Sequence, residues 1–147
     1  MPRIQHSISI ARSPEDVFRI TNDIERWPEL FNEYSKAKVL KYEEAGRFAK
    51  LTFQLSNQDA TWRSWRLLDF QELVAIAERE DPLYPFAYMH LKWTYTPEGN
   101  GTLMTWTQDF EMDPKFEVPL ETVIERMKSH TRENQQRIKE IIESGRV

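Results

Sequence analysis

The chain of 147 residues contains no cysteine and only four glycines. Without cysteine there are no disulfide bonds, no thiolate nucleophile and no cysteine metal site. Four glycines argue against a glycine-rich loop of the kind that binds nucleotide phosphates. The N-terminal stretch MPRIQHSISI has no long apolar run, so it predicts neither a signal peptide nor a membrane span. We therefore expect a cytoplasmic protein with no membrane partner.

Positive charge is also in the minority. The 20 Lys and Arg residues are outnumbered by 24 Asp and Glu residues, which gives a net charge of −4. Nucleic-acid-binding surfaces are normally basic, so we expect no nucleic-acid partner. The three histidines show neither metal-ligand spacing nor an evident nucleophile partner. We therefore expect no metal, no other cofactor and no covalent intermediate.

What the chain does have is length and aromatic residues. Its 147 residues favour one domain, 1–147, with a core of substantial size. Aromatic residues make up 12% of the chain and include five tryptophans. Aromatic side chains fill ordinary cores, but they also line cavities.

The first part of the chain predicts a strand and two short helices. Residues 3–11 alternate isoleucine with polar residues, which is the period of a half-buried strand. Residues 13–23 are typical of a short helix with Ser13 as its N-cap and a proline at the first helical position. A second short helix is expected over residues 23–31, with Asp23 as its cap.

The middle of the chain predicts an antiparallel meander. β-Branched and aromatic residues recur in segments separated by the turn sequences EEAG, SNQD and PEGNG. Short connections of this kind join antiparallel neighbours. The predicted strands span residues 35–43, 46–56, 60–69, 72–80, 86–97 and 101–112.

Residues 117–144 predict a long amphipathic helix, because apolar residues repeat at three- and four-residue steps. Thr131 and Asn134 interrupt this stripe, where a sealed core would prefer Leu or Ile. They favour a hollow centre; the alternative is that both lie at the edge of the stripe and contact solvent. The order of elements predicts an α+β fold with one antiparallel sheet and its helices on one side. The stripe consists of Leu120, Val123, Ile124, Met127, Thr131, Asn134, Ile138 and Ile141.

The predicted strand TWRSWRLLD contains two arginines at positions of opposite parity, Arg63 and Arg66. Because side chains alternate faces along a strand, one of the two points into the interior. A buried guanidinium is unfavourable unless something pairs with it. Alternation does not decide which arginine is buried.

Four segments carry a resemblance to a known family: TNDIERWPELFNEY (21–34), PFAYMHLKWTY (85–95), GTLMTWTQDFEM (101–112) and TRENQQRIKEIIE (131–143). They resemble the monodomain aromatase/cyclases of bacterial type II polyketide synthases, of the tetracenomycin and spore-pigment types. The family belongs to the START-like helix-grip superfamily of lipid-transfer proteins and pollen allergens. The resemblance implies a curved seven-stranded antiparallel sheet around a long C-terminal helix, two short helices after the first strand, and a deep cavity.

The resemblance also implies an activity. The substrate would be an unreduced poly-β-ketone on an acyl carrier protein, and the reaction a regiospecific first-ring aldol cyclisation, C9–C14 or C7–C12, followed by dehydration and aromatisation. The partners would be the carrier protein and other synthase subunits in antibiotic or spore-pigment biosynthesis, and the cyclase itself a monomer or weak dimer. The alternative is a non-catalytic carrier of a lipid, quinone or pigment.

The resemblance assigns catalytic roles to Arg66, Tyr34 and Arg79. Arg66 would face the cavity and donate N–H groups to a developing oxyanion, and Tyr34 would donate or relay a proton. Each residue has a structural alternative. Arg66 can form a buried ion pair with a carboxylate such as Glu78 or Asp109, Tyr34 can be an aromatic lid, and Arg79 can be a surface residue at a strand end.

The walls of the implied cavity are expected to bind the substrate through flat aromatic faces and a few polar groups. For any one of these residues alone, ordinary core packing is the alternative. His90 has the parity of outward-facing neighbours and is not included. The predicted substrate-binding residues are Trp27, Phe31, Phe53, Trp62, Ser64, Phe86, Met89, Trp93, Trp106, Gln108 and Asn134.

Overall fold

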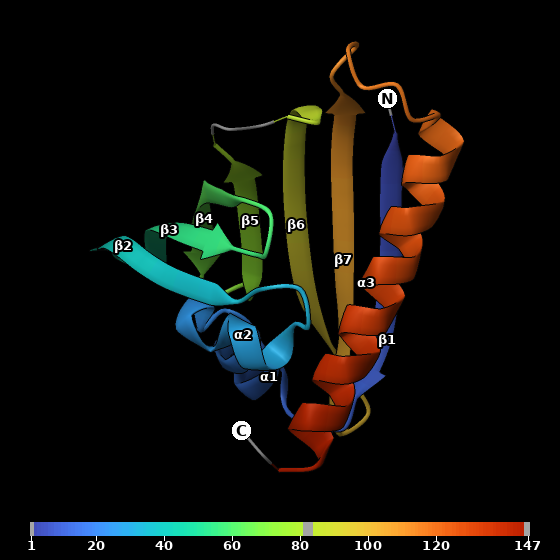
Figure 1. Cartoon of the computed structure of the whole chain (residues 1–147). Coiled ribbons are helices and arrows are strands. Elements are labelled where there is room, and N and C mark those ends of the chain that lie inside the picture. The colour runs from blue at the N-terminus through green and yellow to red at the C-terminus, as the bar shows by residue number, and fades with distance from the viewer. Residues whose placement is uncertain (1, 81–83, 146–147) are drawn as a thin grey trace.

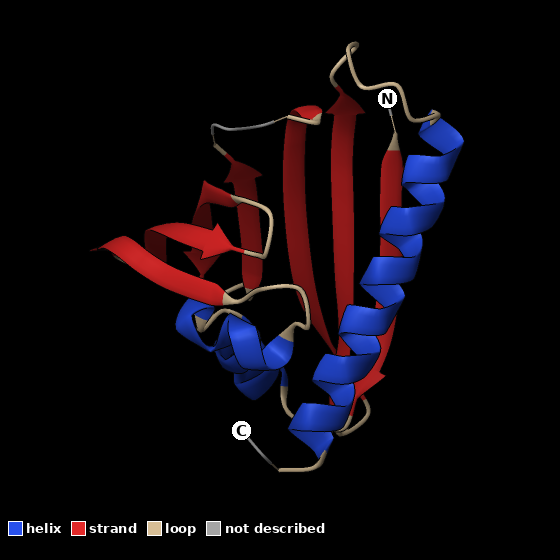
Figure 2. Cartoon of the chain, in the orientation of Figure 1, coloured by secondary structure: helices blue, strands red, loops and turns tan. Residues whose placement is uncertain are grey.

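The computed structural model describes residues 2–80 and 84–145. Figures 1 and 2 show one sheet with a long helix across one face and the short helices at one end. The predicted order of strands and helices is confirmed. The elements are β1 (Arg3–Ile10), α1 (Pro14–Thr21), the 3-10 helix η1 (Ile24–Arg26), α2 (Trp27–Leu30), β2 (Lys36–Ala45), β3 (Phe48–Ser56), β4 (Thr61–Asp69), β5 (Val74–Arg79), β6 (Phe86–Glu98), β7 (Gly101–Met112) and α3 (Leu120–Glu143).

The seven strands form one antiparallel sheet in the order β1-β7-β6-β5-β4-β3-β2. Strands β2 to β7 are a meander, as predicted, and β1 pairs with β7, so that Ile10 lies opposite Thr102. Helix α3 lies along one face of the sheet (Figure 1). We call this face the inner face. The predicted helix-grip architecture is confirmed.

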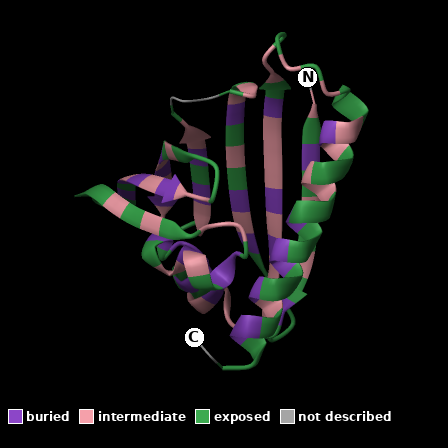
Figure 3. Cartoon of the chain, in the orientation of Figure 1, coloured by how far each residue is buried: buried purple, intermediate pink, exposed green. Residues whose placement is uncertain are grey.

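The buried apolar residues form two clusters, and Figure 3 marks the buried positions along the ribbon in purple. The larger cluster joins α1, η1, α2 and the C-terminal half of α3, where Ile138, Ile141 and Ile142 are buried. The smaller cluster lies at the N-terminal half of α3, around Val123 and Phe110. No helix among the described residues is long and apolar enough to cross a membrane.

Two helix caps, Ser13 and Asp23, were predicted from the sequence. The predicted cap Ser13 is confirmed, since its hydroxyl accepts a hydrogen bond from the Asp16 N–H at 3.3 Å. Asp23 occupies the N-cap position of η1, as predicted, but it makes no side-chain hydrogen bond to the following helix, and its carboxylate lies 3.6 Å from Arg26 instead. The predicted second helix is divided into η1 and α2, because Pro28 has no N–H with which to continue η1.

Two other boundaries differ for local reasons. Helix α3 begins at Leu120 rather than at 117, because Pro119 precedes it and the residue before a proline disfavours helical backbone. Strand β5 begins at Val74 rather than at 72, because Leu73 has a φ of 55°, which is incompatible with a strand. Leu120 was predicted to lie on the buried stripe but is 45% exposed, at the first position of the helix.

Candidate active site

A cavity of about 530 Å³ lies on the inner face, between the strands, the loop after α2 and helix α3. Its volume is within the range of sites that hold small organic ligands. All fourteen residues predicted from the sequence line this one cavity, and their chemical roles stay predictions. They are Trp27, Phe31, Tyr34, Phe53, Trp62, Ser64, Arg66, Arg79, Phe86, Met89, Trp93, Trp106, Gln108 and Asn134.

Arg66 is the arginine of β4 that faces inward. It is 1% exposed, whereas Arg63 on the opposite face is exposed. The predicted alternative, an ion pair with Glu78 or Asp109, is wrong. Both carboxylates lie on the outer face, where Glu78 is 3.3 Å from His90 and Asp109 is 2.6 Å from Arg3.

Neutral groups hold Arg66 in place instead. The Arg66 Nε–H donates to Asn22 Oδ1 at 2.8 Å, and Asn22 Nδ2 donates to Tyr95 Oη at 3.1 Å. The Thr21 hydroxyl donates to the Val17 carbonyl at 2.7 Å, so it accepts from the Tyr95 hydroxyl at 2.6 Å. This buried chain fixes the guanidinium without neutralising its charge.

Two tryptophan rings also contact the guanidinium. Arg66 Cζ lies 4.1 Å from the centroid of the Trp93 ring and 5.2 Å from that of Trp27, which is within cation–π range. Burial lowers the pKa of Arg66 to about 10, and the Tyr95 and Tyr34 hydroxyls oppose this shift. Arg66 is therefore still a cation at neutral pH.

The ends of the guanidinium are unpaired. Arg66 Nη1 and Nη2 are buried and have no hydrogen-bond partner among the described residues, and the same holds for Trp106 Nε1. A buried donor without a partner is unfavourable and therefore rare in native structures. Both side chains line the cavity, so a ligand with carbonyl oxygens can satisfy these donors there.

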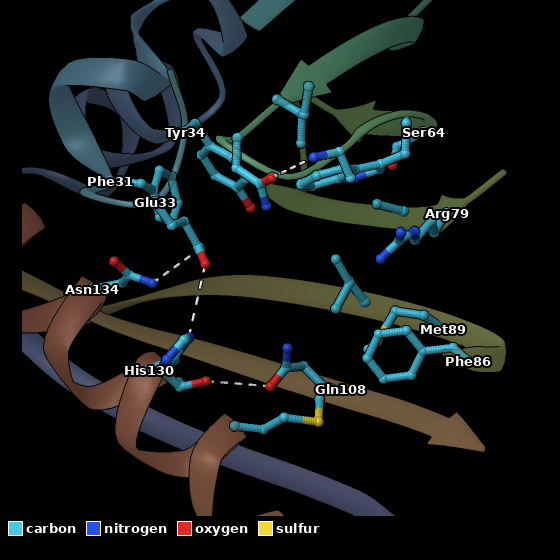
Figure 4. Close-up of a pocket in the computed structure, with 18 of the residues that line it drawn as sticks. Phe31, Glu33, Tyr34, Ser64, Arg79, Phe86, Met89, Gln108, His130 and Asn134 are labelled. Carbon is cyan, nitrogen blue, oxygen red and sulfur yellow. Dashed lines mark hydrogen bonds and ion pairs between the residues drawn. The ribbon is translucent and has the colours of Figure 1, made fainter. Parts of the chain in front are cut away.

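Arg79 and Tyr34 also line the cavity (Figure 4). The Arg79 guanidinium is 4.8 Å from the Trp62 ring centroid and 5.8 Å from that of Phe86, so it is partly buried rather than a surface residue. Burial raises the pKa of the Tyr34 phenol well above its usual value, with Glu33 acting in the same direction and the two arginines opposing. Tyr34 is therefore a neutral phenol, able to donate a proton.

The polar break in α3 faces the cavity. Thr131 and Asn134 are 5% and 7% exposed and line the cavity, so the alternative of a solvent-facing edge is wrong. The Thr131 hydroxyl donates to Gln108 Oε1 at 3.2 Å, and Asn134 Nδ2 donates to Glu33 Oε1 at 3.3 Å. Figure 4 shows both contacts.

Aromatic rings form a continuous wall. Trp93 and Trp106 stack with centroids 4.2 Å apart and an interplanar angle of 10°. Trp27 stacks on Trp93 and on Tyr34, at 5.9 and 5.7 Å, and Tyr34 contacts Trp62 at 6.1 Å. Several of these rings also belong to the larger core cluster, so core packing and cavity lining are not exclusive here.

Sequence reasoning missed Asn22, Glu33 and His130 as members of the site. Asn22 is the C-cap residue of α1, and a polar helix cap gives no sign of a partner 44 positions away. Glu33 adjoins Tyr34, and His130 precedes Thr131 on α3; both line the cavity. His90 faces outward, as predicted. Among the described residues, no three His, Cys, Asp or Glu side chains are grouped as a metal site requires.

The sequence matches that of a known protein family over almost its whole length. The model of the family "polyketide cyclase / dehydrase and lipid transport" matches residues 1–143. The chain belongs to this family, and the predicted recognition is confirmed.

Individual proteins of known name or structure resemble this chain over most of its length. A provisionally named polyketide cyclase of Streptomyces cyaneus is 41% identical over 113 residues, which are 75% of this chain and 73% of the relative. The bifunctional cyclase/dehydratase of the granaticin polyketide synthase of Streptomyces violaceoruber is 25% identical over 99 residues, 67% of this chain and 31% of the relative. The Zhui aromatase/cyclase of Streptomyces sp. R1128 has the same fold, with a TM-score of 0.73, 16% identity, and coverage of 98% and 92% of the two chains.

Proposed function

We propose that the protein is an aromatase/cyclase that closes and aromatises the first ring of an unreduced poly-β-ketone held on an acyl carrier protein. The observation that supports this most directly is a buried arginine whose two Nη groups have no partner among the described residues and which lines an aromatic cavity. Membership of the cyclase family supports the same reaction class. Closure joins C9 to C14 or C7 to C12, and no cofactor takes part.

Aldol ring closure makes specific electrostatic demands. A methylene between two carbonyls loses a proton, and the enolate carbon then attacks a ketone, whose oxygen becomes an alkoxide. Arg66 meets the second demand, because its free Nη–H groups lie in a site shielded from water, where donors aimed at an oxyanion are strongest. Its pKa of about 10 excludes Arg66 itself as the base at neutral pH.

Regiospecific closure also requires one folded conformation of a flexible chain. The stacked rings of Trp27, Trp93 and Trp106 provide flat walls against which a poly-β-ketone folds. The Trp106 Nε1–H and the Gln108 amide provide hydrogen bonds for ketone oxygens. After closure, dehydration breaks the C–O bond and an adjacent C–H bond to form a C=C bond. The Tyr34 phenol gives its proton to the departing hydroxyl, which leaves as water, and regains the proton released from the C–H bond.

A carrier function is the second candidate, and the family's own description includes lipid transport. The apolar and aromatic walls suit a quinone or pigment as well as a substrate. A carrier has no need of a buried cation with unpaired donors, because an apolar residue of similar size would hold an apolar ligand at a lower energetic cost.

The deciding experiment is the product profile of a reconstituted minimal type II synthase. Wild type, Arg66→Ala and the matched outer-face control Arg63→Ala are compared, after calorimetry has shown that each binds an aromatic product mimic. We expect wild type and Arg63→Ala to redirect shunt products to one defined ring and Arg66→Ala not to do so. If wild type leaves the products as they are without added protein, the cyclase function is wrong and the carrier function is favoured.

A further inference from the structure

One carboxylate lines the cavity and has no part in the proposed roles of Arg66 and Tyr34. Glu33 lies in the loop after α2 and is the only acidic residue among the described residues that line the cavity. Figure 4 shows its carboxylate directed across the cavity toward α3. Its side chain is 36% exposed, so it is partly shielded but reachable by water.

Two residues of α3 hold this carboxylate from the opposite side. Asn134 Nδ2 donates to Glu33 Oε1 at 3.3 Å, and His130 Nδ1 lies 3.8 Å from Glu33 Oε2. Neither contact uses all lone pairs of the carboxylate, which has about four acceptor positions. The carboxylate is therefore positioned by its neighbours and retains sites at which to accept a proton.

The other polar groups of the cavity are poor proton acceptors at neutral pH. Arg66 and Arg79 are cations, Tyr34 is a neutral phenol, and amides such as Gln108 are not bases. His130 can accept a proton, but its side chain is 65% exposed, at the solvent side of Glu33. A base for the methylene proton must lie within hydrogen-bond reach of the substrate, and Glu33 is the group best placed for this.

We infer that Glu33 is the general base of ring closure, an inference that rests on the proposed function. The methylene C–H bond breaks, the proton forms an O–H bond with a Glu33 carboxylate oxygen, and the electron pair becomes the enolate. The enolate carbon then forms the new C–C bond to the ketone carbon, and the π bond of that ketone breaks, so that its oxygen becomes the alkoxide to which Arg66 donates. The proton leaves to solvent past the exposed His130. Asn134 and His130 are positioning residues for the carboxylate.

The electrostatic surroundings fit this role. Burial raises the pKa of Glu33 above its usual value, while the attraction of His130 and hydrogen bonds from Tyr34 and Asn134 oppose the shift. A raised pKa makes the carboxylate a stronger base and keeps it ionised only above that pKa. The titratable group nearest to it is His130 on α3, and the arginines around it are Arg126 on α3 and Arg66 and Arg79 beyond Tyr34.

A purely structural role is the competing explanation, since Glu33 joins the loop after α2 to α3. The variant Glu33→Gln separates the two, because a glutamine can still accept from Asn134 but cannot take up a proton. Glu33→Asp keeps a carboxylate one methylene shorter. The matched control is Glu29→Gln, the same change at an exposed residue of α2.

The test is the initial rate of specific ring formation in the reconstituted synthase between about pH 5 and pH 8, with binding of a product mimic measured in parallel. For wild type we expect the rate to rise with pH through the pKa of Glu33. Glu33→Gln should lower the rate about a hundredfold or more, remove this rise and leave binding unchanged. Glu33→Asp should recover part of the rate together with the rise, and Glu29→Gln should match wild type.

The inference is overturned if Glu33→Gln retains the rate within about threefold, or keeps the rise with pH. Either result leaves the cyclase function standing, because wild type still redirects the products. If wild type itself forms no specific ring, the proposed function is wrong and the inference is wrong with it. The wild-type profile alone therefore distinguishes the two failures.

Discussion

On the outer face of the sheet, Arg3 lies 2.6 Å from Asp109 and Glu78 lies 3.3 Å from His90. On the inner face, Arg66 has no carboxylate partner but an amide oxygen at 2.8 Å and two tryptophan rings. These outer groups are partly or largely exposed, and each lies beside a polar or oppositely charged partner. The inner charge is 1% exposed and is held by neutral groups.

The charged groups on the outer face are solvated, whereas the charge of Arg66 is left available to a group inside the cavity. An ion pair inside the cavity would satisfy Arg66 but would also cancel the field that a developing oxyanion needs. The chain from Asn22 through Tyr95 to Thr21 orients the guanidinium and leaves its charge intact. The predictions below test this contrast.

The largest effect is expected from Arg66→Met, with Arg63→Met as the outer-face control. Ring closure should slow by about 10²–10³, the range for loss of one oxyanion donor. Stability should behave differently, since replacing a buried charge with an apolar residue is often neutral or stabilising. We expect the free energy of unfolding, measured in urea, to stay within about 1 kcal/mol of wild type or to rise. A loss above about 3 kcal/mol would mean that Arg66 is mainly a structural residue.

A smaller effect is expected from Asn22→Asp, which gives Arg66 the counter-charge that it lacks. The carboxylate should weaken the interaction of Arg66 with an oxyanion and slow ring closure about tenfold, equivalent to about one pKa unit of interaction. The control Asn100→Asp adds the same charge at an exposed turn position away from the cavity and should leave the rate unchanged. Equal rates for Asn22→Asp and wild type would show that the neutral partner is not needed.

Thr21→Val tests the far end of the same chain. Thr21 is fully buried and accepts from Tyr95 Oη at 2.6 Å, so the valine leaves the Tyr95 hydroxyl without this acceptor. We expect a loss of about 1–3 kcal/mol in the free energy of unfolding. The double variant Thr21→Val, Tyr95→Phe should lose less than the sum of the single variants. Additive losses would argue that the two hydroxyls are not coupled.

The smallest effect is expected on the outer face. Arg3 is largely exposed, and exposed ion pairs contribute little because water and salt screen them. Arg3→Ala should therefore leave both the urea midpoint and the rate of ring closure unchanged at about 0.15 M salt. A clear shift in either would show that the outer face is more than a solvated surface.

Much of the fold followed from local patterns. Alternation and turn sequences located the seven strands, and the three- and four-residue steps located α3. Leu120 was assigned to the buried stripe and the side chain of Asp23 was expected to cap its helix; neither holds, because both residues sit at helix starts, where cap geometry and the neighbouring proline decide. Such ends depend on a few backbone angles that a periodic pattern does not record.

The site was less accessible from sequence. Alternation could not choose between Arg63 and Arg66, since each has the parity of one face; the family resemblance made the choice and the structure agrees. Asn22 and Glu33 were missed because their partners, Arg66 and Asn134, are brought near only by the fold. Contacts between distant segments have no local signature in a single sequence.

The stacked pair Trp93 and Trp106 has an optical consequence. Two indole rings 4.2 Å apart and nearly parallel are close enough to couple electronically, and Trp27 and Trp62 line the same cavity. Four of the five tryptophans thus line the cavity, while Trp65 lies on the outer face. Intrinsic fluorescence and near-ultraviolet circular dichroism should therefore follow occupancy of the cavity without any added label.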